Sequence, residues 1–405
     1  MIGSFKYGWF KVNSLIQNVP VVYNKLVQHV TLAGPKSNGR FGTQVAVNTA
    51  GNIVVASSPQ ATNGFTIAGE ITIYSYSTAG AGFTWNKGGI SGNAANQLLG
   101  RSLAINSEAT RIVHTINTSN GVIEVKQFTA PSTWTKLGQT ITIGQNPINL
   151  SMDGPGNNFI MGVPGNNANA GLARIYNWNG TNWTQRGNDF LGEANQRLGS
   201  VSINKSGNTI AIGAPYIAND AGFNGSVSAL EWDGSAWLMK GSVLSGVESK
   251  SRFGTCVVFN YEGTILAVGA PGKINSNNST GEVRVYEFKD FNWTQMGPSI
   301  TPSVSTNDAF GSSLAFNSAG NILAIGDNLD DFNTATDNGG VTIYQWNGIN
   351  WVNNLPTARF ITANDNSGFS ISLNARGNSL MIGSPQYDSG GFADRGGIRF
   401  YSLSS

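Results

Sequence analysis

Charge and cysteine are both scarce in this chain. Charged residues make up 11% of its 405 residues, against about 25% in an average soluble domain. The formal net charge of +2 gives no electrostatic reason to expect a nucleic acid or an anionic membrane surface as a partner. The one cysteine, Cys256, excludes an internal disulfide and a cysteine-based metal cluster.

Long apolar runs are also missing. No stretch reaches the roughly 20 consecutive apolar residues that a membrane helix needs, so no membrane insertion is expected. Residues 1–20 contain no unbroken apolar region and no small-residue cleavage site, which is not the form of a secretory signal peptide. The polarity of the chain comes from Asn, Ser, Thr and Gly, a composition that favours strands and turns over long helices.

One segment recurs along the chain. The stretch 252–271, RFGTCVVFNYEGTILAVGAP, is one of seven related copies. The Asn or Asp of the turn in each copy falls at positions 48, 106, 153, 204, 260, 317 and 374. The intervals between them are 58, 47, 51, 56, 57 and 57 residues. A period of this length indicates one supersecondary unit per repeat.

Each repeat predicts four strands. The first alternates small and apolar residues and ends at an Asn-x-x-Gly turn, which is typical of a tight hairpin. The second is apolar at nearly every residue, so both of its faces should be buried. The third follows the pattern Gly-x-Val-x-Val-Tyr-x-Trp, and the fourth carries a Trp that we expect to pack between repeats. The sequence therefore predicts an all-β, seven-bladed β-propeller of four-stranded antiparallel blades.

The two ends of the chain together complete the seventh repeat. Residues 396–403 supply its third strand, but no Trp-bearing strand follows them. The segment 22–34 stands at the correct distance before the first repeat, and its Tyr23 matches Trp85. We expect this N-terminal strand to close the ring, because pairing the two ends removes two open sheet edges.

Short motifs in the repeats resemble the FG-GAP repeats of integrin α-subunits. Phe-Gly occurs at 41–42, 253–254 and 310–311, and Gly-Ala-Pro occurs at 213–215 and 269–271. The resemblance covers residues 40–405 and implies a propeller with an adhesion or recognition role, so the protein is not expected to be an enzyme. Integrin repeats often carry a Ca²⁺ loop of the Asp-x-Asp-x-Asp-Gly type. The Asn-x-x-Gly turns here do not supply the roughly six to eight oxygens that Ca²⁺ takes. No cofactor is therefore expected.

Candidates for chemistry are few. His29, His114 and Cys256 fall in predicted strands without a reactive partner nearby, so no catalytic residue is assigned. The best metal candidate is the acidic stretch 326–340, although a solvated polar loop is the favoured interpretation because its spacing matches no known metal loop. Its carboxylates are Asp327, Asp330, Asp331 and Asp337.

An aromatic arm precedes the repeats. The predicted domains are this arm, residues 1–20, and the propeller, residues 21–405. Aromatic residues are enriched at interface cores, so we expect the arm to join the protein to other structural proteins of an assembly. The predicted docking residues are Phe5, Tyr7, Trp9 and Phe10.

The two faces of the predicted propeller differ. The turns between first and second strands are short, whereas the loops between second and third strands are long and different in every repeat. Variable loops on a rigid scaffold tend to carry binding. This long-loop face, which also carries the links between blades, is the predicted surface for a host glycan or protein.

Three functions remain open at this stage. The preferred hypothesis is a structural or attachment protein of a virion, associated with a capsid or tail, because the composition resembles that of extracellular proteins while no export signal is visible. The second is a cellular surface or secreted adhesin. The third is a propeller glycosidase or lyase, which requires paired carboxylates at the central channel.

Overall fold

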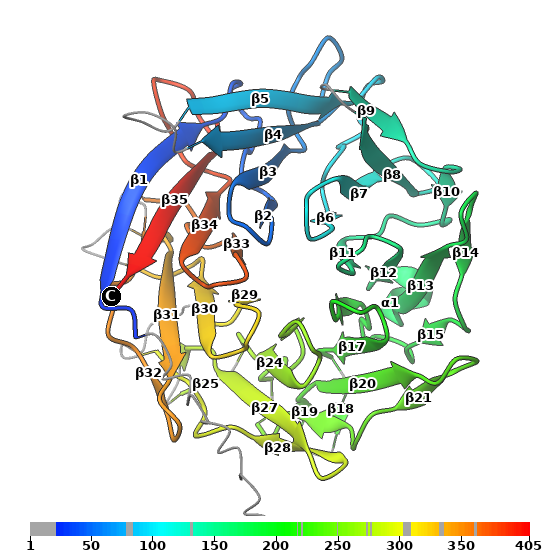
Figure 1. Cartoon of the computed structure of the whole chain (residues 1–405), viewed down its shortest axis with the longest axis vertical. Coiled ribbons are helices and arrows are strands. Elements are labelled where there is room, and N and C mark those ends of the chain that lie inside the picture. Colours follow the sequence, from blue (N-terminus) through cyan, green and yellow to red (C-terminus); the bar gives the residue numbers. More distant parts are fainter. Residues whose placement is uncertain are drawn as a thin grey trace, which may run out of the picture.

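Seven antiparallel sheets stand around a central axis (Figure 1). The computed structural model describes residues 22–77, 84–129, 133–216, 218–219, 222–248, 250–272, 274–275, 278–302, 309–331, 336–359 and 363–405. Within these residues each of the seven sheets of four or five strands is one blade. In blades one to six the strands run from the axis outward in chain order, whereas the outermost strand of blade seven comes from the start of the chain. The predicted all-β, seven-bladed propeller is confirmed.

The first four blades follow directly from the chain order. Blade one contains β2 (Val45–Val47), β3 (Ile53–Ser58), β4 (Glu70–Ser77) and β5 (Thr84–Ser91). Blade two contains β6 (Leu103–Ile105), β7 (Arg111–Ile116), β8 (Val122–Thr129), β9 (Thr133–Lys136) and β10 (Ile141–Thr142). Blade three contains β11 (Asn149–Met152), β12 (Asn158–Val163), β13 (Leu172–Trp178), β14 (Trp183–Gln185) and β15 (Phe190–Leu191). Blade four contains β16 (Ser200–Ile203), β17 (Thr209–Ala214), β20 (Ser226–Trp232), β21 (Trp237–Met239) and β22 (Leu244–Ser245).

The remaining blades complete the ring. Blade five contains β23 (Cys256–Phe259), β24 (Ile265–Gly269), β27 (Val283–Lys289) and β28 (Asn292–Gln295). Blade six contains β29 (Ser313–Phe316), β30 (Ile322–Asp327), β31 (Gly340–Trp346) and β32 (Trp351–Val352). Blade seven contains β33 (Ser370–Leu373), β34 (Ser379–Ser384), β35 (Gly397–Ser404) and β1 (Lys25–Ala33). Small elements lie in the long loops: α1 (Asn166–Asn169), β18 (Ala218–Asn219), β19 (Gly222–Phe223), β25 (Ile274–Asn275) and β26 (Asn278–Ser279).

The N-terminal strand closes the ring, as predicted. β1 pairs antiparallel with β35, from Lys25 opposite Ser404 to Ala33 opposite Gly397. The outer edge of blade seven is thus made by the first described strand of the chain. The arm, residues 1–20, lies outside the described residues, so its boundary and its docking residues Phe5, Tyr7, Trp9 and Phe10 stay predictions.

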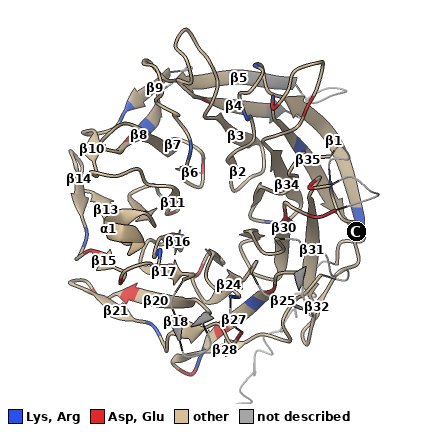
Figure 2. Ribbon diagram, turned by 180° about the vertical axis from the view of Figure 1, so that it is seen from behind, with Lys and Arg blue, Asp and Glu red and all other residues tan. Residues whose placement is uncertain are grey.

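The second strands form the core. β12, β17, β30 and β34 are buried at every residue, because each lies between two strands of its own blade and between two neighbouring blades. The charged residues are scattered over a mostly uncharged ribbon (Figure 2). No helix among the described residues is long and apolar enough to cross a bilayer.

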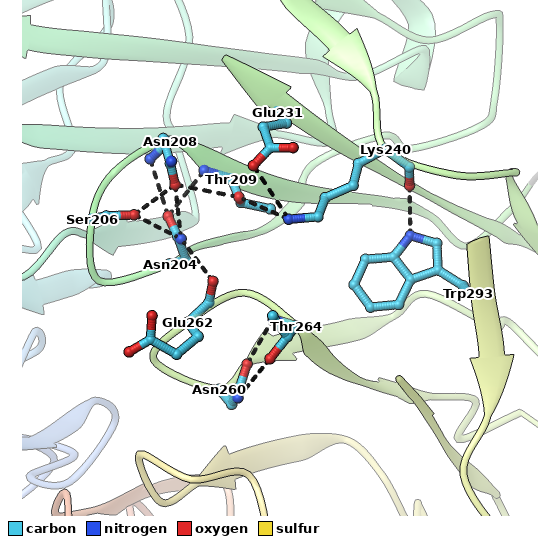
Figure 3. A network of polar contacts seen from close by, with 10 residues as sticks. All are labelled: Asn204, Ser206, Asn208, Thr209, Glu231, Lys240, Asn260, Glu262, Thr264 and Trp293. Atoms are coloured by element: carbon cyan, nitrogen blue, oxygen red, sulfur yellow. Dashed lines mark hydrogen bonds and ion pairs between the residues drawn. The ribbon is translucent and has the colours of Figure 1, made fainter. Parts of the chain in front are cut away.

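The Asn side chain organises each hairpin turn. In blade four, Asn204 Oδ1 accepts from the N–H groups of Asn208 and Thr209 at 3.0 and 2.9 Å, and its Nδ2 donates to Asn208 Oδ1 at 2.9 Å (Figure 3). The same pair of backbone bonds recurs in all seven turns, with Asp153 in place of Asn in blade three. The carboxamide accepts hydrogen bonds from two backbone N–H groups of the turn and donates one to a side chain of the same turn. This explains the recurrence of Asn at this position.

The Phe-Gly and Gly-Ala-Pro motifs meet between blades. A Cβ atom added at Gly213 would overlap the carbonyl oxygen of Gly254 in the next blade, and Gly269 has the same relation to Gly311. The blades approach here so closely that only glycine fits. Both motifs therefore recur for a packing reason.

The outer tryptophans also join neighbouring blades. The indole Nε1 of Trp293 donates to the backbone carbonyl of Lys240 at 2.6 Å (Figure 3). Trp183, Trp237 and Trp351 make the equivalent bond to the preceding blade at 3.0 Å. The expected packing of these residues between repeats is confirmed.

Candidate recognition site on the long-loop face

The hairpin turns meet at the axis in a closed ring of backbone hydrogen bonds. In each blade the residue after the turn Asn or Asp donates its N–H to the carbonyl of its counterpart in the next blade, at 2.8 to 3.2 Å. The ring runs through Thr49, Ser107, Gly154, Lys205, Tyr261, Ser318, Ala375 and back to Thr49. Because every link uses backbone atoms, the ring fixes the spacing of all seven blades at this face.

The central channel ends at this ring. A cavity of about 310 Å³ is lined by the inner strands, among them Val47, Leu103 and Phe316, and by Lys205 and Tyr261 at the hairpin end. Lys205 Nζ and Tyr261 Oη each lie 3.3 Å from Thr49 Oγ1, so side chains from three blades converge at that end. Among the described residues, no Asp or Glu lines this cavity.

A second cavity, of about 380 Å³, lies on the opposite, long-loop face where blades one, two and seven meet. It contains two arginines, an aromatic ring and three amides, and none of the described residues that line it is acidic. The phenyl ring is 43% exposed, so it is available for a ligand to stack on. These polar and aromatic residues are Arg40, Arg101, Phe369, Gln60, Gln386 and Asn366.

The repeat itself places arginines on this face. Arg40, Arg197 and Arg252 each precede the Phe-Gly or Leu-Gly step that opens a blade, with φ values of 54°, 51° and 55°. Leu98 and Asn366 adopt the same left-handed conformation at the equivalent position. The conformation is thus a property of the repeat, and arginine occupies it in three blades.

Two of these arginines share one tyrosine. The guanidinium carbons of Arg197 and Arg252 lie 4.8 and 5.7 Å from the ring centroid of Tyr216, a loop residue of blade four. Stacking of this kind holds a guanidinium in place without neutralising its charge. The long-loop face therefore carries two positively charged clusters, Arg40 with Arg101 and Arg197 with Arg252.

The charge of Arg40 is only weakly compensated. Its guanidinium lies 3.9 Å from the carboxylate of Asp394, and the two side chains are 42% and 35% exposed. An ion pair this long and this exposed contributes little. Arg40 Nε is buried without a hydrogen-bond partner among the described residues, so the exposed remainder of the side chain is the part that an anionic ligand can reach.

The acidic loop of blade six does not gather its carboxylates. Asp327 Oδ1 accepts from the N–H of Ala309, and Asp331 Oδ1 accepts from the N–H of Asp337, both at 2.9 Å. Asp330 pairs with Arg359 at 2.9 Å; burial raises the pKa of Asp330 and the guanidinium opposes that rise. Among the described residues, no group of three or more His, Cys, Asp and Glu side chains is placed to hold a metal ion.

The two histidines and the cysteine lie in strands. His29 Nε2 is 2.6 Å from Ser402 Oγ, and its ring stacks on Phe400 at 5.2 Å. His114 is fully buried, and burial lowers its pKa to about 4. Burial raises the pKa of the Cys256 thiol to about 12. At neutral pH Cys256 is therefore a thiol, which is not the nucleophilic form, and His114 is a neutral imidazole that the core encloses.

The arginine clusters were missed by the sequence reasoning, although a signal for them was present. Arg precedes the Phe-Gly or Leu-Gly step at positions 40, 197 and 252. An alignment of the repeats shows that these residues share one register position, which a search for motifs within single repeats does not reveal.

Comparisons with known proteins establish the fold. No family model matches the chain, so the likeness to FG-GAP repeats remains a resemblance, and no curated protein sequence matches it. Among solved structures, the chain is similar to Kuenenia stuttgartiensis hydrazine synthase, with a TM-score of 0.57. The match covers 87% of this chain and 94% of that chain at 13% sequence identity, which shows a shared fold.

This likeness corrects one prediction. The sequence reasoning predicted that the protein is not an enzyme and ranked a glycosidase or lyase last, because the motifs resembled those of adhesion proteins and the first strands carry almost no carboxylates. Hydrazine synthase contains a chain of the same fold, and its name states an enzymatic activity. The prediction that the protein is not an enzyme is therefore wrong. It was drawn from the fold, and one fold can host unrelated functions, enzymatic ones included.

Proposed function

We propose that the long-loop face binds an acidic glycan at the cavity between blades one, two and seven. The observation that carries the proposal is the pair Arg40 and Arg101, which share a cavity that no acidic residue lines in the described part of the chain. Arg presents a planar fork that matches carboxylate and sulfate groups. The exposed ring of Phe369 offers a stacking surface for a sugar, and the amides of Gln60 and Gln386 can bond its hydroxyl groups.

In this proposal the protein is an attachment or structural protein of a virion, and the glycan belongs to the host. The support for this setting is the composition, poor in charge and rich in Asn, Ser, Thr and Gly. A cellular adhesin with the same site is the alternative. Mass spectrometry of purified particles and of culture supernatant separates the two, because a virion protein is found in the particles.

A binding measurement tests the site. A heparin-derived oligosaccharide and a neutral oligosaccharide of equal length are titrated into the full chain at low salt. We expect binding of the acidic sugar alone, and a loss of at least about tenfold in affinity for R40A/R101A, since each charge-assisted bond contributes about 1.5–3 kcal/mol. The control is R376A, which removes one positive charge from the hairpin face. Equal weakening by R376A, or tighter binding of an acidic peptide than of the sugar, contradicts the proposal.

The aromatic arm is the second part of the proposal. Phe5, Tyr7, Trp9 and Phe10 would anchor the chain in its assembly, because truncation of a buried Trp at an interface often costs about 2 kcal/mol or more. The variant W9A/F10A is expected to keep the unfolding temperature of the propeller and to lose incorporation into particles. Normal incorporation of this variant contradicts the docking role.

A further inference from the structure

A third cavity lies on the hairpin face, on the side of the molecule opposite the arginine clusters. It has a volume of about 510 Å³, and its lining includes Ser107, Glu108, Lys205, Ser206, Tyr261 and Glu262. Lys205 and Tyr261 also line the hairpin end of the central channel. The amine of Lys205 thus lies at the boundary between two cavities, at the centre of the seven-blade ring.

Unlike Lys126 and Lys240, Lys205 forms no ion pair among the described residues. Lys205 Nζ bonds a hydroxyl, Thr49 Oγ1 at 3.3 Å, and lies 4.3 Å from the ring centroid of Tyr261. By contrast, Lys126 pairs with Glu124 at 2.8 Å, and Lys240 pairs with Glu231 at 3.4 Å.

The position of Lys205 makes its amine easier to deprotonate. Burial lowers the pKa of Lys205, while the carboxylates of Glu108 and Asp153 oppose that shift. A lysine that loses its proton more easily is a better nucleophile at neutral pH, which is how proteins activate lysines toward carbonyl compounds. Burial also raises the pKa of Tyr261, so the phenol keeps its proton and remains a donor.

We propose that Lys205 captures a neutral aldehyde in the hairpin-face cavity as an imine. The lone pair of Nζ attacks the carbonyl carbon, and a proton passes from nitrogen to the former carbonyl oxygen to give a carbinolamine. The C–O bond then breaks, a second proton from nitrogen leaves with the hydroxyl group as water, and a C=N bond forms. The step is reversible and needs neither an oxidant nor a reductant.

Two neighbouring features assist the proton transfers of imine formation and select among carbonyl compounds. Tyr261 Oη is 3.3 Å from Thr49 Oγ1, which in turn contacts Lys205 Nζ, so the two hydroxyls connect the phenol to the reacting nitrogen. Glu108 and Glu262 line the same cavity. Their negative charges disfavour a carbonyl compound that carries a carboxylate, so the expected ligand class is a neutral aldehyde, such as an open-chain sugar.

Reductive trapping of the full chain tests the proposal. The protein is incubated with glyceraldehyde and cyanoborohydride at pH 6.5, and labelling of each lysine is followed over time by peptide mass spectrometry. We expect Lys205 to be labelled faster than the exposed Lys25 and Lys289, because a lowered pKa leaves a larger neutral fraction of the amine at this pH. Equal rates at the three lysines overturn the proposal.

Further measurements distinguish reactivity from simple exposure. The labelling rate at Lys205 should reach its plateau at a lower pH than the rate at Lys25, and Y261F should slow Lys205 while leaving Lys25 unchanged. With glyoxylate, an anionic aldehyde, the ratio of Lys205 to Lys25 labelling should fall. The variant K205R should have an unchanged circular dichroism spectrum, which shows that the fold is kept, and should lose the rapid labelling seen at Lys205. A ratio that is unchanged by pH, by Y261F and by the charge of the aldehyde also overturns the proposal.

Discussion

The backbone of Tyr23 is held by the side chain of Gln345. The N–H of Tyr23 donates to Gln345 Oε1 at 2.8 Å, and Gln345 Nε2 donates to the carbonyl of Tyr23 at 2.7 Å, both in buried surroundings. Tyr23 precedes the closing strand β1, whereas Gln345 lies in β31 of blade six. One amide side chain therefore connects the N-terminal segment to the neighbouring blade across 322 positions of sequence.

Removal of this amide should weaken the closure of the ring. In Q345A the buried N–H and C=O of Tyr23 both lose their partner, and each buried group left unsatisfied costs about 1–3 kcal/mol. We expect the free energy of unfolding, measured by urea titration, to fall by about 2–4 kcal/mol. The control Q295A removes an exposed amide that bonds only Gly297 of its own blade. A fall in the free energy of unfolding of less than about 0.5 kcal/mol for Q345A lies in the usual range for surface changes. It would show that the hydrogen bonds between Gln345 and Tyr23 are not needed to close the ring.

The glycine contact between blades gives a second prediction. A methyl group at Gly213 overlaps the carbonyl of Gly254 in blade five, so G213A must push two blades apart. Overpacking of a close contact typically costs about 1–3 kcal/mol, and thermal unfolding should detect it as a lower midpoint. Gly165 has no neighbour within 4 Å of an added Cβ atom, so G165A is the matched control. If both variants melt alike, the blades are not held at the glycine contact.

The repeat pattern accounts for most of the fold. Strand two is apolar at nearly every residue because it is covered on both faces, and the outer Trp recurs because its indole bonds the preceding blade. Tyr23 could be aligned with Trp85 because the closing segment keeps the spacing of a fourth strand. These features repeat in the sequence because the same physical contact repeats around the ring.

The polar centre of the hairpin face could not be predicted in the same way. The ring of seven bonds uses backbone atoms, so its members share no side chain: Thr49, Gly154, Lys205 and Tyr261 occupy one structural position. The contact between Lys205 and Thr49 joins residues 156 positions apart. The spacing of residues within one repeat does not predict which turns contact one another across the axis. For the same reason the partner of Asp330, Arg359 on a later segment, was not apparent.

Acid should destabilise the protein through His114. In the folded state burial lowers the pKa of His114 from 6.5 to about 4, so the unfolded chain takes up a proton at a higher pH than the native protein does. The stability that depends on neutral His114 is complete above pH 6.5 and is lost as the pH falls toward 4. At 1.36 kcal/mol per unit of pKa, the total effect is about 3 kcal/mol.

The variant H114L isolates this effect. Leucine is apolar and cannot be protonated. It removes only the long contact of 3.5 Å between His114 Nδ1 and the carbonyl of Thr115, because Nε2 has no hydrogen-bond partner among the described residues. The difference in unfolding free energy between H114L and the natural protein should grow in favour of H114L between pH 7 and pH 4. A difference that stays constant over this range contradicts a neutral, buried His114.

Asp153 should have the opposite dependence on pH. It replaces Asn at the turn of blade three, is 1% exposed, and accepts from the N–H groups of Asn157 and Asn158 and from Asn158 Nδ2. Burial raises its pKa, although these hydrogen bonds oppose the rise. The stabilising contribution of protonated Asp153 is therefore present at low pH and is lost as the pH rises through the native pKa.

Exchanging the turn residues in both directions tests this. D153N should gain stability relative to the natural protein as the pH rises from below 3.8 through the raised native pKa of Asp153, because it removes a buried ionisation. N204D does the reverse in blade four, where a carboxylate would face Asn208 Oδ1 and the carbonyl of Glu262, both acceptors (Figure 3). We expect N204D to be destabilised more at pH 7 than at pH 4, by about 1–3 kcal/mol. Unfolding curves at several pH values check both signs. If the two variants change stability in the same direction as the pH rises, the assignment of Asn as the neutral, two-way hydrogen-bonding residue of the turn is wrong.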